Sequence, residues 1–179
     1  MARINDNLFT TLMRHTLPQQ FHGRLMTLFG PLHAEFNDNG LCTLKFEDPE
    51  TQPRTIDSAF RHAFLTWLQA FEHLSADRRW QYFAPQGTLF QNKVWQALLH
   101  LPHGTTISYK KLAAAIGQPT AVRAVASAVA ANPICLLIPC HRVINTDGRY
   151  GKYRWGADRK LALLDAERSD ASDLLRLFL

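Results

Sequence analysis

Three short hydrophobic stretches near the start of the chain predict a small antiparallel sheet. They cover residues 24–29, 32–36 and 41–46. The triplet Asp-Asn-Gly at 38–40 favours a tight hairpin turn before the last stretch. Within that stretch Cys42, Leu44 and Phe46 alternate with polar residues, so we expect this face, Cys42 included, to be buried.

A helical periodicity follows. Between residues 58 and 74, large apolar side chains recur at intervals of three and four, namely Phe60, Phe64, Trp67, Leu68 and Phe71. This spacing predicts an amphipathic helix whose aromatic face packs into a core rather than around a cofactor. The polar stretch 75–87 is predicted to link an N-terminal α/β domain (1–86) to a C-terminal domain (87–179).

The second half of the chain predicts a helix-turn-helix. Thr88 and Gln91 have the spacing of a capping box that opens a helix, which Pro102 terminates. Ser108 can cap a second helix over 109–116, and Thr120 a third that reaches residue 131. Two short helices in succession are typical of a unit whose second helix meets DNA.

The predicted third helix is rich in small residues. Val122, Val125 and Val129 share one side, and the rest of its surface carries Arg123 with alanine and serine. Such a surface suits close approach to a narrow groove without readout of base sequence. Packing on both sides within a bundle is the alternative that this pattern leaves open.

Charge and cysteine content add modest information. Twenty Lys and Arg against fifteen Asp and Glu give a net charge of +5, which fits a negatively charged partner. The cysteines Cys42, Cys135 and Cys140 form no Cys-x-x-Cys pair, so we expect neither a disulfide framework nor a zinc site. The chain has no signal-peptide pattern and no apolar run long enough to span a membrane, which predicts a cytoplasmic protein.

The segment after the third helix is predicted to carry a reactive thiol. Asn132-Pro133 stops the helix, because proline pushes the preceding residue out of the α region. Residues 134–138 then read as a buried strand or extended segment, with Cys135 in the core. Cys140 stands at the end of this segment.

The neighbours of Cys140 offer ways to activate it. A thiol becomes a good nucleophile as thiolate, and His141 or Arg142 can lower its pKa if they reach it. Adjacent side chains of an extended segment point to opposite faces, so the base can also act through a turn or a water. Glu167, on a helix predicted over 158–167, can orient the histidine.

Two smaller expectations concern the remaining segments. His100 and His103 flank Pro102 at a helix end and are expected to be solvated. Leucines and a phenylalanine between 174 and 178 predict a short terminal helix, without indicating what it packs on.

Five stretches between residues 90 and 167 match a known family in its order: FQNKVWQALLHLPHGTTISYKKLAAAIG, RAVASAVAANP, LLIPCHRVI, GKYRWGADRK and LLDAE. They resemble the O6-alkylguanine-DNA alkyltransferases, also called methylated-DNA-protein-cysteine methyltransferases; the Pro-Cys-His-Arg-Val core is highly specific. FGPLHAEFNDNGLCTLKF resembles the family's N-terminal hairpin more faintly. The resemblance implies a ribonuclease-H-like N-terminal α/β domain with a small sheet, followed by a mostly α, winged-helix-like C-terminal domain that contains the helix-turn-helix.

The resemblance also implies a reaction. The alkyl group on O6 of guanine, or on O4 of thymine, in duplex DNA would pass to Cys140 irreversibly and once per molecule, after the damaged nucleotide is flipped out. It implies a monomer that acts on duplex DNA without a cofactor. Some relatives carry a structural zinc in the N-terminal domain, but here that half has only Cys42 and scattered histidines, so we expect no metal. Many relatives have Ser-Gly-Gly after the pocket tyrosine, whereas this chain has Arg-Trp-Gly at 154–156, which puts the width of the pocket in question.

The site residues that the resemblance implies fall into three groups. The catalytic group is Cys140, His141, Glu167, Asn132 and Tyr109, in which His141, a water and Glu167 withdraw the thiol proton. The DNA-binding group is Arg123, Tyr109, Ala124 and Ser127, with Arg123 filling the stack in place of the flipped nucleotide. The lesion pocket is Val129, Val143, Tyr153 and Arg154, with the backbone N–H of Arg154 near O6 of the guanine.

Two other interpretations remain. A lesion-binding protein of the same fold would flip alkylguanine without accepting the alkyl group, but such relatives carry tryptophan in place of Cys140. A helix-turn-helix regulator from another class would use Cys140 as a structural thiol. That regulator would need to bind a specific sequence, which the alanine-rich third helix makes hard to supply.

Overall fold

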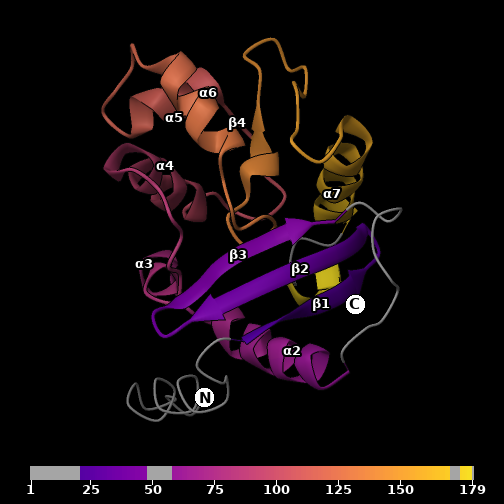
Figure 1. Ribbon diagram of the computed structural model, residues 1–179. Helices are drawn as coiled ribbons and strands as arrows, with labels where there is room; N and C mark the ends of the chain where they lie inside the picture. Colours follow the sequence, from indigo (N-terminus) through magenta and orange to yellow (C-terminus); the bar gives the residue numbers. More distant parts are fainter. Residues whose placement is uncertain (1–20, 48–57, 170–173, 179) are drawn as a thin grey trace.

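The computed structural model describes residues 21–47, 58–169 and 174–178. A small sheet with one long helix lies beside a group of shorter helices (Figure 1). The strands are β1 (Phe21–Thr27), β2 (Gly30–Asn37), β3 (Gly40–Phe46), β4 (Ile107–Ser108) and β5 (Val143–Ile144). The α-helices are α2 (Ser58–Glu72), α3 (Ala76–Trp80), α4 (Leu89–Leu99), α5 (Tyr109–Ala115), α6 (Val122–Ala130) and α7 (Ala157–Ser169), and the 3-10 helices are η1 (Cys140–Arg142) and η2 (Leu174–Phe178).

The N-terminal half is an antiparallel sheet in the order β1-β2-β3 with α2 packed against it (Figure 1). The five large apolar residues predicted to line the buried face of α2 are all buried. Phe64 of α2 meets Phe36 of β2 edge to face, with ring centroids 6.2 Å apart. The prediction of an aromatic core at this position is therefore confirmed.

The turn between β1 and β2 comes earlier than the hydrophobic pattern predicts. Strand β1 ends at Thr27, and Leu28, which is 79% exposed, belongs to the turn rather than to the strand. The hydroxyl of Thr27 donates to the carbonyl of Gly30 at 2.8 Å, and Gly30 adopts a φ of +116° that side chains disfavour. A polar anchor and a glycine thus make a turn out of two apolar residues.

The prediction that Cys42 is buried is wrong, because β3 contains a bulge. Thr43 pairs with Glu35, but the next pair is Leu41 with Phe36, which leaves Cys42 as an extra residue. The bulge turns both Leu41 and Leu44 toward the core and leaves Cys42 half-buried. The prediction from alternating apolar and polar residues assumed a strand without a bulge.

The stretch 75–87 is more structured than its polar composition predicts. It contains α3, and the chain after this helix forms a bridge to β3 through Phe83. Leu41 donates to the carbonyl of Tyr82 at 2.9 Å, and Ala84 donates to Leu41 at 2.9 Å. A Cβ atom on Gly40 would lie 2.3 Å from the Tyr82 oxygen, so this close backbone contact requires glycine.

Local capping signals place the helices of the C-terminal half. Thr88 accepts from the backbone N–H of Gln91 at 3.2 Å, and the Gln91 side chain accepts from the Thr88 N–H at 2.8 Å, which confirms the capping box. Ser108 caps α5 as predicted. The prediction for Thr120 is wrong: residues 118–121 form a turn, so α6 starts later, with Ala121 at its N-cap and no side-chain cap bond.

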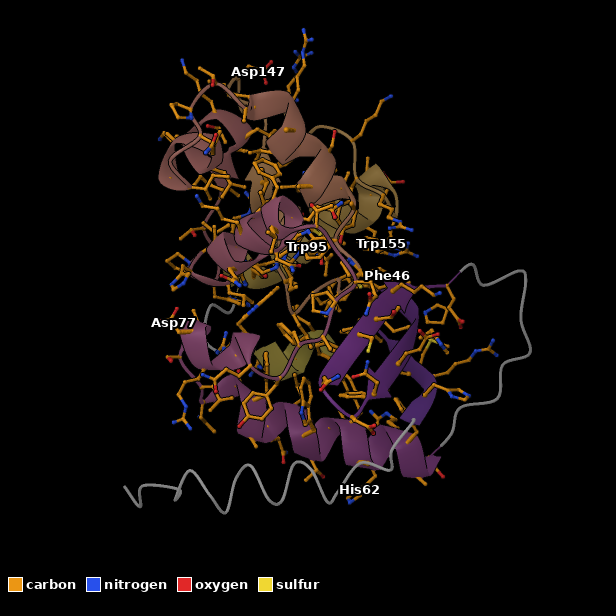
Figure 2. The ribbon with its side chains drawn as sticks, turned by 60° about the vertical axis from the view of Figure 1, so that its left-hand side comes forward. Phe46, His62, Asp77, Trp95, Asp147 and Trp155 are labelled. Carbon is orange, nitrogen blue, oxygen red and sulfur yellow. The ribbon has the colours of Figure 1, made fainter. Side chains whose placement is uncertain are left out.

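Aromatic side chains are among the contacts between the two halves of the chain. Phe46 at the end of β3 meets Trp155 at a centroid distance of 6.0 Å (Figure 2). The predicted terminal helix is present as η2, and Phe178 packs on Phe64 of α2 at 5.4 Å. None of the described helices is long and apolar enough to cross a bilayer.

Candidate active site

The segment that leads to Cys140 docks on the N-terminal sheet and then turns sharply. Leu44 of β3 donates to Pro133 at 2.9 Å, and Cys135 donates back to Leu44 at 2.7 Å. The chain turns at Leu136, whose φ of +66° is the one positive value found for a non-glycine residue in the described ranges. The prediction of an extended segment over 134–138 holds at Ile134, which bridges to β3, and is wrong beyond it.

The side chain of Asn132 holds this turn together. Its amide nitrogen donates to the carbonyls of Ile134 at 3.2 Å and Ile138 at 2.8 Å, and its oxygen accepts from the Ile134 N–H at 3.0 Å. Asn132 is fully buried, so these bonds are shielded from water. The backbone conformation of Leu136 costs free energy, and a network of this kind can offset that cost.

Cys140 opens the short helix η1 with its thiol withdrawn from solvent. Its exposed fraction is 4%. Burial raises the pKa of the thiol, and Asn132, Lys160 and Tyr153 act in the opposite direction without cancelling that effect. Neither His141 nor Arg142 is among the groups that lower this pKa, and the group is a neutral thiol at pH 7.

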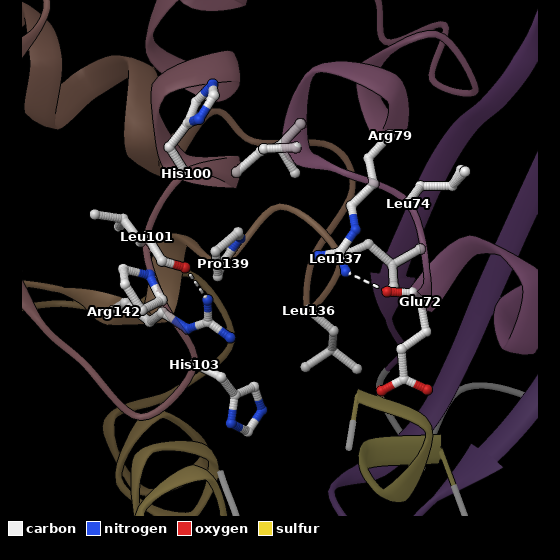
Figure 3. Close-up of a pocket in the computed structure, with 13 residues that line it drawn as sticks. Glu72, Leu74, Arg79, His100, Leu101, His103, Leu136, Leu137, Pro139 and Arg142 are labelled. Atoms are coloured by element: carbon white, nitrogen blue, oxygen red, sulfur yellow. Dashed lines mark hydrogen bonds between the residues drawn. The ribbon is translucent and has the colours of Figure 1, made fainter. Parts of the chain in front are cut away.

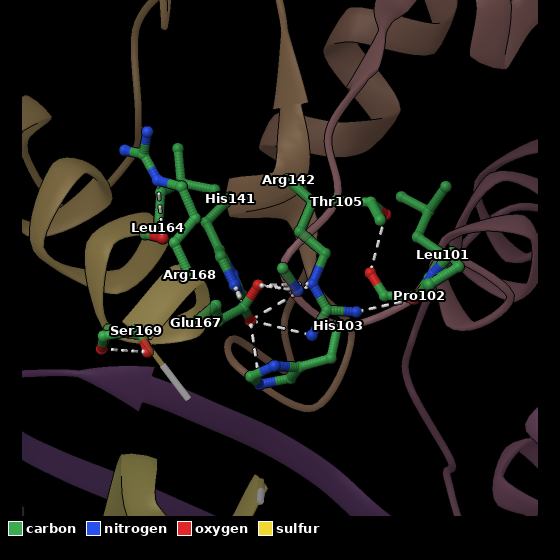
Figure 4. A network of polar contacts seen from close by, with 12 residues as sticks. Leu101, Pro102, His103, Thr105, His141, Arg142, Leu164, Glu167, Arg168 and Ser169 are labelled. Atoms are coloured by element: carbon green, nitrogen blue, oxygen red, sulfur yellow. Dashed lines mark hydrogen bonds and ion pairs between the residues drawn. The ribbon is translucent and has the colours of Figure 1, made fainter. Parts of the chain in front are cut away.

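His141, the residue after Cys140, forms a fully buried pair with Glu167 (Figure 4). The imidazole Nε2 lies 2.8 Å from a carboxylate oxygen of Glu167. A carboxylate can only accept, so Nε2 carries the proton and Nδ1 of the neutral ring is the basic nitrogen. Nδ1 is buried and makes no hydrogen bond to the described residues, so it is available to a proton that arrives from elsewhere.

The ionisation states of this pair follow from burial and from each other. Burial lowers the pKa of His141, against the opposing effect of Glu167, so the ring is neutral at pH 7. Burial alone would raise the pKa of Glu167, but hydrogen bonds from His141 and Arg142 outweigh it and hold that pKa well below its usual range. The pair is therefore a neutral base backed by a fixed negative charge.

Arg142 forms hydrogen bonds with Glu167 rather than with the thiol. Its Nε lies 2.9 Å from one carboxylate oxygen and its Nη2 lies 2.8 Å from the other, while Nη1 donates to the Leu101 carbonyl at 2.7 Å. The suggestion that Arg142 lowers the pKa of Cys140 is not supported by these contacts. A bidentate guanidinium fixes the orientation of the carboxylate that His141 uses.

The two histidines near Pro102 differ from each other. His100 is 56% exposed at its side chain, as predicted, and pairs with Asp77. His103 is only 18% exposed, and its Nε2 lies 3.7 Å from Glu167, so the expectation that it is solvated is wrong. The loop after α4 folds back over the end of α7, where the Gly104 N–H also reaches Glu167 at 3.3 Å.

Lys160 is a site residue that the sequence argument overlooked. It is 1% exposed, and its ammonium donates to the carbonyls of Val143 at 2.6 Å and Tyr150 at 2.5 Å. Burial lowers its pKa to about 8, and the nearby Cys140 acts in the opposite direction. The available signal was the inward stripe of α7, where Lys160 and Glu167 share a spacing with Leu163 and Leu164.

A small pocket lies against Cys140. It is lined by Tyr109, Val129, Ala130, Cys140, Lys152, Tyr153, Arg154, Trp155 and Lys160. Of the residues predicted for a lesion pocket, three are brought together here, whereas Val143 is fully buried in β5 behind the wall. The cavity volume is about 20 Å³, so a purine cannot enter until the pocket widens.

A larger cavity of about 380 Å³ lies on the other side of the active-site segment (Figure 3). Arg79 and Glu72 line one side of it, and Arg142, His103 and Leu101 line the other. It touches the residues that hold Glu167 but not Cys140. The smaller pocket beside the sulfur is therefore the candidate for substrate.

Helix α6 has one exposed face. Arg123, Ala124, Ser127 and Ala130 are exposed, whereas Val125 and Val129 are buried. Packing of α6 on both sides is therefore wrong for this helix. Ala128, which the sequence pattern assigns to the outer surface, is fully buried, and its carbonyl accepts from the Trp95 indole at 2.8 Å. Of the positions predicted to contact DNA, Arg123, Ala124 and Ser127 share the open face, and Tyr109 lies in the wall of the small pocket.

Comparison with known proteins agrees with this geometry. Residues 89–169 match the family model described as 6-O-methylguanine DNA methyltransferase, DNA binding domain. The Regulatory protein ada of Salmonella typhimurium is 60% identical over 82 residues, which is 46% of this chain and 23% of that protein. The chain therefore spans about a quarter of the length of that relative.

Longer matches extend over both halves of the chain. A crystal structure of Mycobacterium tuberculosis OGT in complex with DNA superposes with a TM-score of 0.66 and 34% identity, covering 88% of this chain and 99% of that one. The methylated-DNA--protein-cysteine methyltransferase of Mycolicibacterium paratuberculosis is 38% identical over 158 residues, covering 78% of this chain and 93% of its own length. On this evidence the chain belongs to the family of methylated-DNA-protein-cysteine methyltransferases, the O6-alkylguanine-DNA alkyltransferases.

Proposed function

We propose that this protein repairs DNA by direct reversal, taking the alkyl group from O6 of guanine in duplex DNA onto the sulfur of Cys140. The observation that carries the proposal is a single thiol at the wall of a pocket, next to a buried His141–Glu167 pair. Family membership supports the same reaction, since curated relatives are named for alkyl transfer to cysteine.

The thiol proton must leave before the sulfur can attack. Cys140 is neutral at rest, and Nδ1 of His141 is the basic atom that can receive its proton, directly or through a bridging water. Glu167 then stabilises the imidazolium without taking the proton. Lys160 adds a positive charge that favours the thiolate.

Displacement occurs at the alkyl carbon. The sulfur forms a bond to this carbon as the carbon–O6 bond breaks, and the electron pair of that bond stays with the guanine. The hydroxyl of Tyr109 and the backbone N–H of Arg154 would stabilise the negative charge that develops on the base. The product is a thioether with no polarised centre for water to attack, so each molecule would react once.

Access to the lesion requires a flipped nucleotide. The target carbon is stacked inside the duplex, and extrusion costs a few kcal/mol. Arg123 projects from the exposed face of α6, where Ala124 and Ser127 allow close approach to the groove. In this proposal Arg123 fills the gap left by the base, and Val129, Tyr153 and Arg154 receive the base.

The finer features of the proposal follow the family resemblance. O4-alkylthymine would be a second substrate, and the protein would act as a cytoplasmic monomer without a cofactor. Residues 1–86 would form a ribonuclease-H-like domain, and residues 87–179 a winged-helix-like domain that binds DNA. Within the second of these domains, Asn132 would couple DNA binding to the chemistry by joining the end of α6 to the segment that carries Cys140.

Transfer of a labelled methyl group tests the proposed function. The protein is incubated with an excess of duplex that carries one radiolabelled O6-methylguanine, the label per protein molecule is measured, and the labelled peptide is identified by mass spectrometry. We expect one label per molecule on Cys140 and none on the Cys140→Ala variant. Cys135→Ala is the matched control, since this second buried thiol is expected to be dispensable for transfer. Tight lesion binding without transfer would indicate a lesion-binding protein, and label on Cys42 or Cys135 would contradict the role of Cys140.

A further inference from the structure

We propose that Arg159 is a positioning residue that ties one wall of the substrate pocket to the N-terminal sheet, and thereby limits the size of the O6 substituent that the pocket admits. That wall is residues 152–155, here called the pocket loop. The inference rests on the proposed function, because it concerns which alkyl groups reach Cys140.

Arg159 makes three contacts that converge from distant parts of the chain. Its Nε donates to the carbonyl of Phe29, in the turn between β1 and β2, at 2.7 Å. Its Nη1 donates to the carbonyl of Trp155, in the pocket loop, at 2.6 Å. Its guanidinium carbon lies 4.4 Å from the ring centroid of Phe46, at the end of β3. One side chain therefore joins the sheet to the loop.

The glycine at position 30 makes room for this guanidinium. A Cβ atom at Gly30 would lie 3.2 Å from Nη2 of Arg159, closer than most real Cβ contacts. The positive φ that completes the turn after β1 and the approach of Arg159 thus require the same residue. The sheet therefore offers the guanidinium two things: a carbonyl that accepts a hydrogen bond, and the space left by the absent side chain of Gly30.

The constraint reaches the pocket through two aromatic rings. Trp155 packs edge to face on Phe46, at 6.0 Å, on its outer side (Figure 2). On its inner side Trp155 packs on Tyr153 at 5.3 Å, and both rings line the pocket beside Cys140. The outer surface of the pocket loop is therefore held against the sheet at both its backbone and its side chain.

This arrangement links pocket width to the sheet. The cavity of about 20 Å³ must open to accept a base with its substituent, and the pocket loop forms one whole side of it. Outward movement of the loop would press Trp155 against Phe46 and strain the bond from Arg159 to the Trp155 carbonyl. A longer substituent requires the pocket loop to move further than a methyl group does. The contacts that hold the loop should therefore slow transfer from large lesions more than transfer from small ones.

The test compares two lesions in one protein. Single-turnover transfer rates are measured on duplexes that carry O6-methylguanine or O6-butylguanine. Arg159→Met keeps the aliphatic stem and removes both hydrogen bonds, and it is expected to raise the butyl-to-methyl rate ratio by about tenfold, the scale of one charge-assisted bond. Arg159→Lys can keep one bond and should fall between. Arg168→Met, at an exposed turn of the same helix, should match the wild-type ratio.

A merely structural role would slow both reactions equally, so an unchanged ratio in correctly folded Arg159→Met would overturn the inference. If that variant does not fold, Phe46→Leu removes the ring that Arg159 and Trp155 share, and an unchanged ratio there overturns it as well. Transfer of neither group by the wild-type protein would overturn the proposed function, and the inference with it. Transfer by wild type with unchanged ratios in the variants would overturn the inference alone.

Discussion

The protonation states of three buried side chains, Cys140, His141 and Glu167, decide how Cys140 can react. At pH 7 the thiol and the imidazole are both neutral and Glu167 carries a negative charge. A buried thiolate without a partner would be costly, so a resting enzyme with a neutral thiol avoids that cost. In the proposed reaction the thiolate forms when His141 takes up the proton of the thiol.

The rate of alkyl transfer is predicted to stay high below the usual pKa of histidine. His141 must be neutral to accept the proton, and a neutral ring exists above its pKa. Because burial lowers that pKa from 6.5, the fall in single-turnover rate on acidification should be centred below pH 6.5. Rates in a quench experiment between pH 5 and 8 measure this, with O6-methylguanine duplex in excess.

Circular dichroism at each pH provides the control. The lowered pKa of Glu167 stabilises the fold above the unfolded value near 4.5, and this contribution is lost only as the pH falls below that value. The lowered pKa of His141 acts the other way, because the fold loses some stability as the pH falls below 6.5, and circular dichroism identifies the range in which the fold stays intact. A fall in rate centred at pH 6.5 or above, with the fold intact, would contradict the neutral-base assignment.

Residue identity predicted part of the site. Cys140 and His141 stand in a local motif, and a helix with inward spacing placed Glu167 near them, so the pair could be predicted. The roles of Arg142 and Lys160 could not, because their partners are carbonyls and a carboxylate that only the folded chain brings near. Burial also reversed the expected shift of the Cys140 pKa, which depends on surroundings that a motif does not contain.

At the level of elements, α6 combines a buried valine stripe with an exposed face of small residues and one arginine. A long polar side chain on that face would read bases, and a methyl group leaves room for the backbone of the groove. Arg123 is the one long side chain on this face. In the proposed function this face suits close approach to DNA more than discrimination among sequences.

Arg123→Ala is predicted to weaken nucleotide flipping more than duplex association. The arginine compensates for lost stacking only once the base has left, so the effect on binding to undamaged duplex should be about twofold, as for a single phosphate contact. The fluorescence of a 2-aminopurine beside the lesion reports flipping, and it should fall by about tenfold in population. Ser127→Ala, on the same face, is the matched control. Equal losses in binding and flipping would count against the finger role of Arg123.

Sequence signals located elements well where the determinants are local. The capping box at Thr88 and the cap at Ser108 act within four residues, so their helices begin where predicted. The bulge at Cys42 and the turn at Leu136 depend on pairing between strands and on the Asn132 side chain. The sequence pattern within either segment does not contain that information. Alternation therefore predicted a buried Cys42, and apolarity predicted an extended segment over 134–138.

On the scale of the whole molecule, the C-terminal end of the chain completes the N-terminal core. Leu177 and Phe178 are 3% and 2% exposed, and Phe178 contacts Phe64 of α2. Helix η2 contacts both α2 and β1, and through Phe178 it adds an aromatic ring to this core (Figure 1). The aromatic cluster of α2 is therefore built from both ends of the protein.

Phe178→Ala is predicted to lower the free energy of unfolding by about 3 kcal/mol, the usual cost of deleting a buried phenyl ring. Urea denaturation followed by circular dichroism measures the change. Leu28→Ala offers a matched apolar truncation at a residue that is 79% exposed, and should change stability by less than about 0.5 kcal/mol. A similar small effect at Phe178 would mean that η2 does not contribute to the core.

The backbone bonds between Leu44 and the segment around Cys135 tie the reactive sulfur to a strand in the other half of the chain. Anything that shifts β3, such as a ligand on the sheet or a substitution near its bulge, would move the anchoring point of the turn before Cys140. The sheet contributes no side chain to the proposed chemistry, but it helps to fix the position of the Cys140 sulfur.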